Sequence, residues 1–161
     1  MSDVQPIPAG YHTIIPHLCV TGAAQAIDFY KAAFGAEEIC RSPTPDGRLM
    51  HAELRVGDSV VFVNDDFPEF SGKASSASAL GGSPVTIHIS TTDCDGDIQR
   101  AVDAGATLTM PPQDMFWGDR YGRVQDPFGH QWSFSTHIRD VSPEEMQAAG
   151  EAMFQDPGAC E

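Results

Sequence analysis

The sequence predicts an α+β fold in a single domain, residues 1–161, built from two βαβββ modules. A helical pattern ends in Gly-Ala in each half of the chain, first at Gly35-Ala36 and again at Gly105-Ala106. A tight turn between two strand-like runs also recurs, from Gly57-Asp58 to Phe128-Gly129, at almost the same offset in numbering. Because helix, short strand and hairpin repeat in one order at nearly one spacing, we predict an internal duplication. The alternative is chance alternation in an unduplicated α+β protein.

The first module is expected over residues 13–70. Its helix should begin near Ala23, with Thr21 as a candidate cap, and should end at Gly35, since glycine accepts the left-handed conformation common after helices. The first strand carries His17. The runs expected to be strands in this module are 14–20, 38–41, 49–56 and 60–63.

Ser, Ala and Gly dominate residues 71–84, which we predict to be a flexible linker to a second module over 85–138. The helix of the second module should cover 93–104 and stop at Gly105. The turn at 126–129 contains a proline followed by a glycine, a pattern typical of tight turns. The runs expected to be strands are 85–90, 107–110 and the two arms of the hairpin within 116–137.

Residues 139–161 are predicted to contain an acidic tail helix. Ser142-Pro143-Glu144-Glu145 combines an N-cap serine, a proline at the first helical position and a glutamate at the third, which is a capping box. The helix should extend to about Phe154. We expect it to pack against the protein or a partner and to take no part in chemistry.

The amino-acid composition limits the kinds of partner and the cellular location that we expect. The formal net charge of −14 disfavours nucleic acid and anionic membranes, so neither is expected as a partner. The four cysteines form no Cys-x-x-Cys pair. No cationic and apolar leader opens the sequence, and no apolar run approaches the roughly 18 residues of a membrane span. We therefore expect a cytoplasmic protein with reduced thiols.

Two strands place polar side chains on one side. His51 and Glu53 share one side of the run 49–56, and His88 lies on the polar side of 85–90. Periodicity leaves open whether this side faces water or a cavity. Separately, Trp117-Gly118-Asp119-Arg120, on an expected loop, sets a wide aromatic ring beside a carboxylate and a guanidinium. This group can stack on a small ligand, or it can be a structural ion pair under a half-buried tryptophan.

Several motifs resemble those of the vicinal oxygen chelate superfamily, which contains glyoxalase I, extradiol dioxygenases and the bleomycin and fosfomycin resistance proteins. These motifs are Ala26-Ile27-Asp28-Phe29-Tyr30, Phe34-Gly35-Ala36-Glu37 and Asp126-Pro127-Phe128-Gly129-His130. Three more are similar to its PhnB-like branch, namely Arg48-Leu49-Met50-His51-Ala52-Glu53-Leu54, Trp117-Gly118-Asp119-Arg120-Tyr121-Gly122 and Thr136-His137-Ile138 with Ser142-Pro143-Glu144-Glu145-Met146. The resemblance implies half-open barrel modules whose polar strand faces line a cavity, completed in a homodimer.

The resemblance also implies where a metal would bind, on the first and last strands of each module. Carried over without gaps, the four ligand positions become Ile15, Phe62, Thr86 and Ser133. None offers an imidazole or a carboxylate, so we expect a metal-poor cavity and no cofactor. The alternative is a relocated divalent metal site made of His17, His88 and either Glu53 or His51, because His17 and His88 each lie two residues beyond a lost ligand position.

We therefore predict a PhnB-like protein that binds a small organic ligand, with its specific activity left open. The candidate ligand-binding residues are His17, His88, Trp117, Asp119, Arg120 and Gln125. His51 and Glu53 are the candidate acid–base pair of a competing hypothesis, a glyoxalase-like lyase or isomerase. A third hypothesis is a dimeric protein-interaction module that uses the tail helix.

Overall fold

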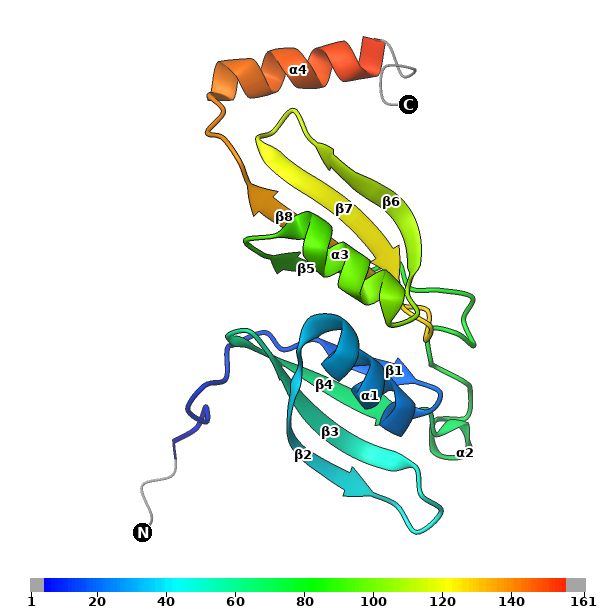
Figure 1. Ribbon diagram of the computed structural model, residues 1–161. Coiled ribbons are helices and arrows are strands. Elements are labelled where there is room, and N and C mark those ends of the chain that lie inside the picture. The colour runs from blue at the N-terminus through cyan, green and yellow to red at the C-terminus, as the bar shows by residue number, and fades with distance from the viewer. Residues whose placement is uncertain (1–4, 156–161) are drawn as a thin grey trace.

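The computed structural model describes residues 5–155, which form two four-stranded sheets with helices packed against them (Figure 1). The elements of the first module are β1 His17–Val20, α1 Ala23–Phe34, β2 Glu37–Pro43, β3 Leu49–Val56 and β4 Ser59–Asp65. Those of the second are β5 Thr86–Ser90, α3 Cys94–Asp103, β6 Thr107–Asp114, β7 Asp119–Gln125 and β8 Gln131–His137. The short helix α2, Pro68–Ser71, follows the first module, and α4, Pro143–Gln155, follows the second.

The two modules have the same topology, which confirms the predicted duplication. The strand order is β1-β4-β3-β2 in one sheet and β5-β8-β7-β6 in the other. In each, the first strand pairs in parallel with the last, and the remaining pairs are antiparallel. Even the register repeats, because His17 lies opposite Phe62 and its counterpart His88 lies opposite Ser133, the counterpart of Phe62. Within the described residues, neither sheet is closed into a barrel.

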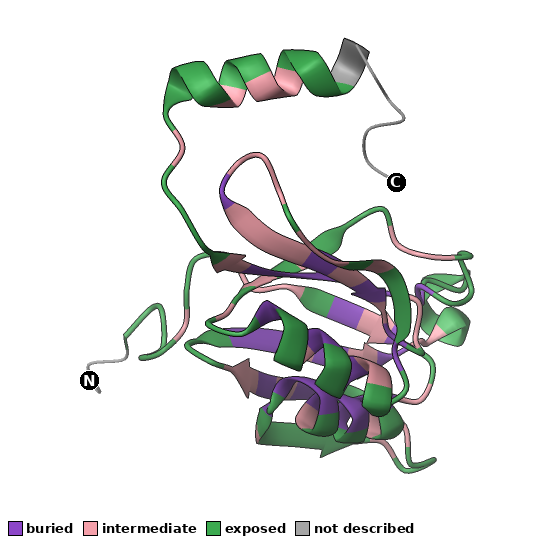
Figure 2. Cartoon of the chain, turned by 45° about the horizontal axis from the view of Figure 1, so that its top comes forward, coloured by how far each residue is buried: buried purple, intermediate pink, exposed green. Residues whose placement is uncertain are grey.

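The core lies between the two modules, where α1 contacts both. Its buried alanines pack on the first sheet, and its aromatic side chains reach strand β8 of the second. The ring centroid of Phe34 lies 4.5 Å from that of Trp132, and that of Tyr30 lies 5.5 Å from it. The helices α1 and α3 also touch each other. Figure 2 shows buried residues concentrated around these helices and the strands beneath them.

Two buried carboxylates organise the helix start and the hairpin turn. The prediction that Thr21 caps α1 was wrong, because α1 begins after Gly22, whose φ is 88°. Asp65 Oδ1, at the end of β4, accepts instead from the backbone N–H groups of Gly22 and Ala23, at 2.8 and 2.9 Å. Asp126, in the second hairpin turn, is only 4% exposed and accepts from Tyr30 and Trp132. It therefore links α1 to β8.

Some strand boundaries differ from those expected. The segment 117–120 was predicted to be a loop, but β7 already begins at Asp119. The strand β6 continues past the expected 110 to Asp114, and its register shifts around Pro111 and Pro112, where no backbone N–H is available for the ladder. The first strand starts only at His17, directly after Pro16.

The connection between the modules lies wholly within the described residues and contains no strand, and its middle packs against the protein. Ser76 is fully buried, and Ala77 is 4% exposed. Asp66 Oδ2 accepts from the backbone N–H groups of Ser75 and Ser76, at 2.8 and 2.9 Å. The residues 71–84 are thus attached at their midpoint to the end of β4.

The predicted capping box is confirmed at the start of α4. The Ser142 N–H donates to Glu145 Oε2 at 3.0 Å, and the Glu145 N–H donates to Ser142 Oγ at 3.2 Å. Within residues 5–155, α4 makes no contact with another helix or strand, and it stands away from both sheets (Figures 1 and 2). No helix in this range is long and apolar enough to cross a membrane.

Candidate functional site

Each sheet has one face covered by helices and one face turned away from them, which we call the open face of that module. In β3, Ala52 and Leu54 are buried on the covered side, whereas His51 and Glu53 remain partly exposed on the other. In β7, a Cβ on Gly122 would lie 2.4 Å from Ile98 Cδ1 of α3, so this position faces the helix. The alternate positions of both strands therefore form the open faces.

The open face of the first module brings three predicted residues together. His51 Nε2 lies 3.1 Å from Glu53 Oε1, and Tyr11 donates its hydroxyl to the other oxygen of the same carboxylate. The His17 and His51 ring centroids are 6.1 Å apart, and both rings pack edge-on against Phe62. The result is a chain of Tyr11, Glu53 and His51 beside a second imidazole.

The protonation states of Glu53 and His17 on this face follow from hydrogen bonding, burial and the neighbouring side chains. The bond from Tyr11 lowers the pKa of Glu53, and the same bond raises the pKa of Tyr11. Burial lowers the pKa of His17, and the neighbouring His51 lowers it further. At neutral pH Glu53 is therefore an anion and His17 is neutral. An ionised carboxylate that orients an imidazole is an arrangement suited to proton transfer.

The open face of the second module is a wall of flat rings. His88 lies with Nδ1 2.9 Å from Ser133 Oγ and with Nε2 3.0 Å from Ser135 Oγ, so both hydroxyls hold its ring. Tyr121 stacks on His88 with 15° between the ring planes, at 6.2 Å between centroids. Trp117 meets Tyr121 edge-on at 5.8 Å. The rings of β5, β7 and the loop before β7 thus form one continuous surface, which we call the ring wall.

Asp119 holds the side chains at the edge of the ring wall in place. Its carboxylate accepts from Trp117 Nε1 at 3.1 Å and from His137 Nδ1 at 2.9 Å. The bond from His137 to Asp119, helped by Asp140, raises the pKa of His137. Gln125 lies farther along the same side of β7, opposite Gln131 of β8. Asp119 therefore positions the tryptophan, and Gln125 offers an amide at the other end of the face.

The structure separates Arg120 from this group. Because side chains alternate along β7, Arg120 lies on the covered side with Gly122. Its guanidinium forms ion pairs with Asp95 of α3 and with Asp114 of β6. Arg120 thus ties a helix to a sheet edge and does not accompany Trp117 on the open face.

Three residues of the open faces were missed from the sequence. Tyr121 and Arg123 alternate with Asp119 and Gln125, so strand periodicity would have identified them if β7 had been expected to begin two residues before Tyr121. Tyr11 lies in an arm without regular structure before β1, and no local signal connects it to Glu53, 42 residues later.

The residues present do not fit the chelated metal that the resemblance implies. Phe62 is packed under two imidazoles, and the Ser133 hydroxyl is engaged with His88. The relocated set is also divided, with His17 and Glu53 on the first module and His88 on the second. Across the described part of the chain, no three His, Cys, Asp or Glu side chains are grouped so that they could hold a metal ion.

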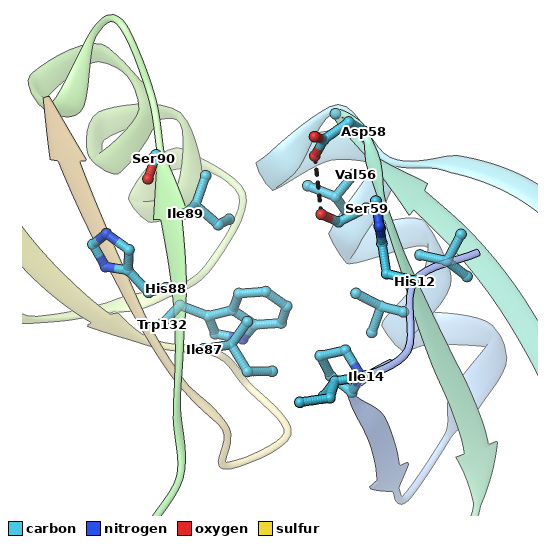
Figure 3. A pocket seen from close by; sticks show the side chains of 14 residues that line it. His12, Ile14, Val56, Asp58, Ser59, Ile87, His88, Ile89, Ser90 and Trp132 are labelled. Atoms are coloured by element: carbon cyan, nitrogen blue, oxygen red, sulfur yellow. Dashed lines mark hydrogen bonds between the residues drawn. The ribbon is translucent and has the colours of Figure 1, made fainter. Parts of the chain in front are cut away.

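A cavity of about 440 Å³ lies between the modules (Figure 3). It is lined by His12, Ile14 and Pro16, by residues 56–61 and 87–90, and by Trp132. Ile87 and Ile89 point toward the arm before β1, whereas His88 points away on the other side of β5. Among the predicted site residues, His88 alone borders this cavity. The cavity is therefore a seam between modules and not the predicted site.

Comparisons with known proteins agree with this architecture. Residues 12–134 match the model of a family described as the Glyoxalase/Bleomycin resistance protein/Dioxygenase superfamily. An uncharacterized protein of Mycobacterium bovis is 53% identical over 135 residues, which cover 83% of this chain and 89% of that protein. The crystal structure of TioX from Micromonospora sp. ML1 is 30% identical with a TM-score of 0.62, and the match covers 79% of this chain and 99% of TioX. The X-ray structure of a gene product from Arabidopsis thaliana is 31% identical with a TM-score of 0.62, over 78% of this chain and 98% of that one.

Proposed function

Because the chain belongs to the Glyoxalase/Bleomycin resistance protein/Dioxygenase superfamily, we propose that it is a PhnB-like member that binds a small organic ligand without a metal. The supporting observation is the pair of open faces, which carry imidazoles, a carboxylate and stacked aromatic rings. A site for a small molecule needs a few polar groups that converge on a largely apolar or aromatic surface. Two of the motifs that resemble the PhnB-like branch, at 48–54 and 117–122, supply residues of these faces.

In this proposal, the ligand-binding cavity is a different one, which forms between the open faces of two copies of the chain. Both covered faces point toward α1 and α3, so the two open faces point away from their shared core. Neither open face can therefore cover the other within one chain. In a homodimer, the first open face of one protomer would meet the second open face of its partner. The ligand would lie between the His51–Glu53 pair of one copy and the ring wall of the other.

Trp117 should contribute the stacking energy for this ligand. In a thermal-shift screen of small aromatic and oxyanion compounds, we expect at least one class to raise the melting temperature of the wild type. Trp117→Ala should weaken binding of that class about tenfold, the loss of roughly 1.4 kcal/mol expected for one aromatic contact. The matched control is Phe70→Ala, which removes an 85% exposed ring on α2. A screen without any stabilising compound, or an equal loss in both variants, would count against the proposal.

A second candidate function is proton-transfer catalysis of the glyoxalase type, favoured by the Tyr11–Glu53–His51 chain. With a hemithioacetal as the probe substrate, Glu53→Gln and His51→Gln should each lower kcat about a hundredfold, a normal contribution of a general base. Turnover should continue in the presence of a chelator. Turnover lost with the chelator would point to a metal instead, and absence of turnover in the wild type would leave ligand binding as the function.

A further inference from the structure

The open face of the second module carries a cation that no acidic side chain of the described residues neutralises. Among residues 5–155, Arg123 Nε is the one buried side-chain nitrogen or oxygen atom with no hydrogen-bond partner. Arg123 also forms no ion pair within the described residues. In contrast, four other arginines are paired with carboxylates, namely Arg41, Arg48, Arg100 and Arg120.

Arg123 lies next to the ring wall, beside Tyr121 on β7. It lies opposite Ser133 of β8, and Ser133 lies opposite His88 of β5, so Arg123 and His88 flank one serine across the sheet. Tyr121 is two residues away on the same side of β7, and Gln125 is two residues away in the other direction. The guanidinium thus shares a face with stacked aromatic rings and an amide.

The acidic residue of this face, Asp119, does not pair with Arg123. The two oxygens of Asp119 accept from Trp117 and His137, which hold that carboxylate at the edge of the wall. The chain has 23 acidic residues against nine basic ones, yet none of its described acids is paired with this guanidinium. A buried donor without a partner destabilises the folded protein. Because Arg123 as a residue is only half-buried, an anion that arrives from outside could form charge-assisted hydrogen bonds with its guanidinium.

We propose that Arg123 binds the anionic group of the ligand, so that the ligand class is a small aromatic carboxylate whose ring lies against Tyr121 and Trp117. This inference rests on the proposed function, ligand binding on the same face, and names the chemistry that the face selects. Arg123 sets the preference for an anionic ligand, and the rings accept any planar group of suitable size. The hydroxyls of Ser133 and Ser135 both hydrogen-bond with His88, beside Arg123 on the same face.

The test uses the full-length protein and three probes of one shape: benzoate, neutral benzamide and cationic benzamidine. Binding is followed by NMR through the indole N–H of Trp117, with that of the buried Trp132 as the internal reference. Wild type should bind benzoate about tenfold more tightly than benzamide, and benzamidine more weakly still. Arg123→Gln should bind benzoate no better than benzamide, and Arg123→Lys should keep part of the preference. Arg41→Gln, which removes a cation paired with Glu38, should leave the preference unchanged.

A stability measurement separates a ligand-binding role from a structural one. Because Arg123→Gln removes a half-buried cation that forms no ion pair within the described residues, its melting temperature without ligand should equal or exceed that of the wild type. A lower melting temperature together with an unchanged preference for benzoate would overturn the inference. Equal binding of benzoate and benzamide at Trp117 would overturn the anionic ligand class and leave the proposed function standing. If neither these probes nor any screened compound shifts the Trp117 signal, the proposed function fails as well.

Discussion

Asp126→Ala is expected to lower the free energy of unfolding by about 4 kcal/mol, because it leaves several buried donors without an acceptor. Asp126 Oδ2 accepts from the Tyr30 hydroxyl at 2.8 Å and from Trp132 Nε1 at 2.9 Å. Asp126 Oδ1 accepts from the backbone N–H groups of Phe128 and His130, at 2.9 and 2.8 Å. The first pair joins α1 to β8, and the second closes the turn, so one substitution weakens both the interface between modules and the hairpin.

Urea unfolding followed by circular dichroism measures this loss. Tyr30→Phe removes one of the four donors and should cost about 1 kcal/mol. The matched control is Asp58→Ala, at the exposed turn that occupies the corresponding place in the first module, and its effect should stay within about 0.5 kcal/mol. A loss below about 1 kcal/mol for Asp126→Ala would show that this carboxylate does not hold the modules together.

Phe34→Ala is expected to lower the free energy of unfolding by about 3–5 kcal/mol, the usual cost of deleting a buried aromatic ring. The Phe34 side chain is 7% exposed, and it belongs to α1 of the first module. Its ring centroid lies 4.5 Å from that of Trp132 and 5.8 Å from that of Phe134, both on β8. The substitution therefore opens a cavity between the modules and not within one of them.

Since this ring is shared, both modules should unfold in one transition at a lower urea concentration. Circular dichroism reports the whole chain. Fluorescence, recorded with Trp117→Phe as the background so that only the buried Trp132 emits, reports the interface, and the two curves should coincide in the variant. Phe70→Ala, at an 85% exposed ring, should change stability by no more than about 0.5 kcal/mol. Separate transitions in the wild type would contradict a shared core.

The elements of the fold could be predicted from the sequence because their signals are local. The helix from Ala23 to Phe34 followed from apolar spacing, and its end at Gly35, with a φ of 65°, followed from the freedom of glycine. The start of α3 is set by Asp93, whose side chain accepts from the N–H of Gly96, three residues later. The start of α1 near Ala23 was also predicted correctly, but its cap was not, because the acceptor, Asp65, lies 42 residues away from Ala23.

The candidate site was only partly predictable, for a related reason. Alternation along β3 identified His51 and Glu53 as neighbours on one side, and the structure places them 3.1 Å apart. Because residues 117–120 were interpreted as a loop, the same alternation of side chains was not applied to β7. Arg120 was therefore selected, although it lies on the covered side, and Arg123 was overlooked. The hydroxyl of Tyr11 reaches Glu53 from a segment with no periodicity at all.

By itself the sequence determined the order of the elements, their duplication at one nearly constant offset and the residues that share a strand side. Only the tertiary structure decided which side is open, that Asp126 connects the two modules and that Arg123 is left without a partner among the described residues. Backbone propensity and side-chain periodicity act over a few neighbouring residues. Burial and hydrogen-bond partnership depend on residues far apart in the chain, such as Tyr30 and Asp126, which are separated by 96 positions.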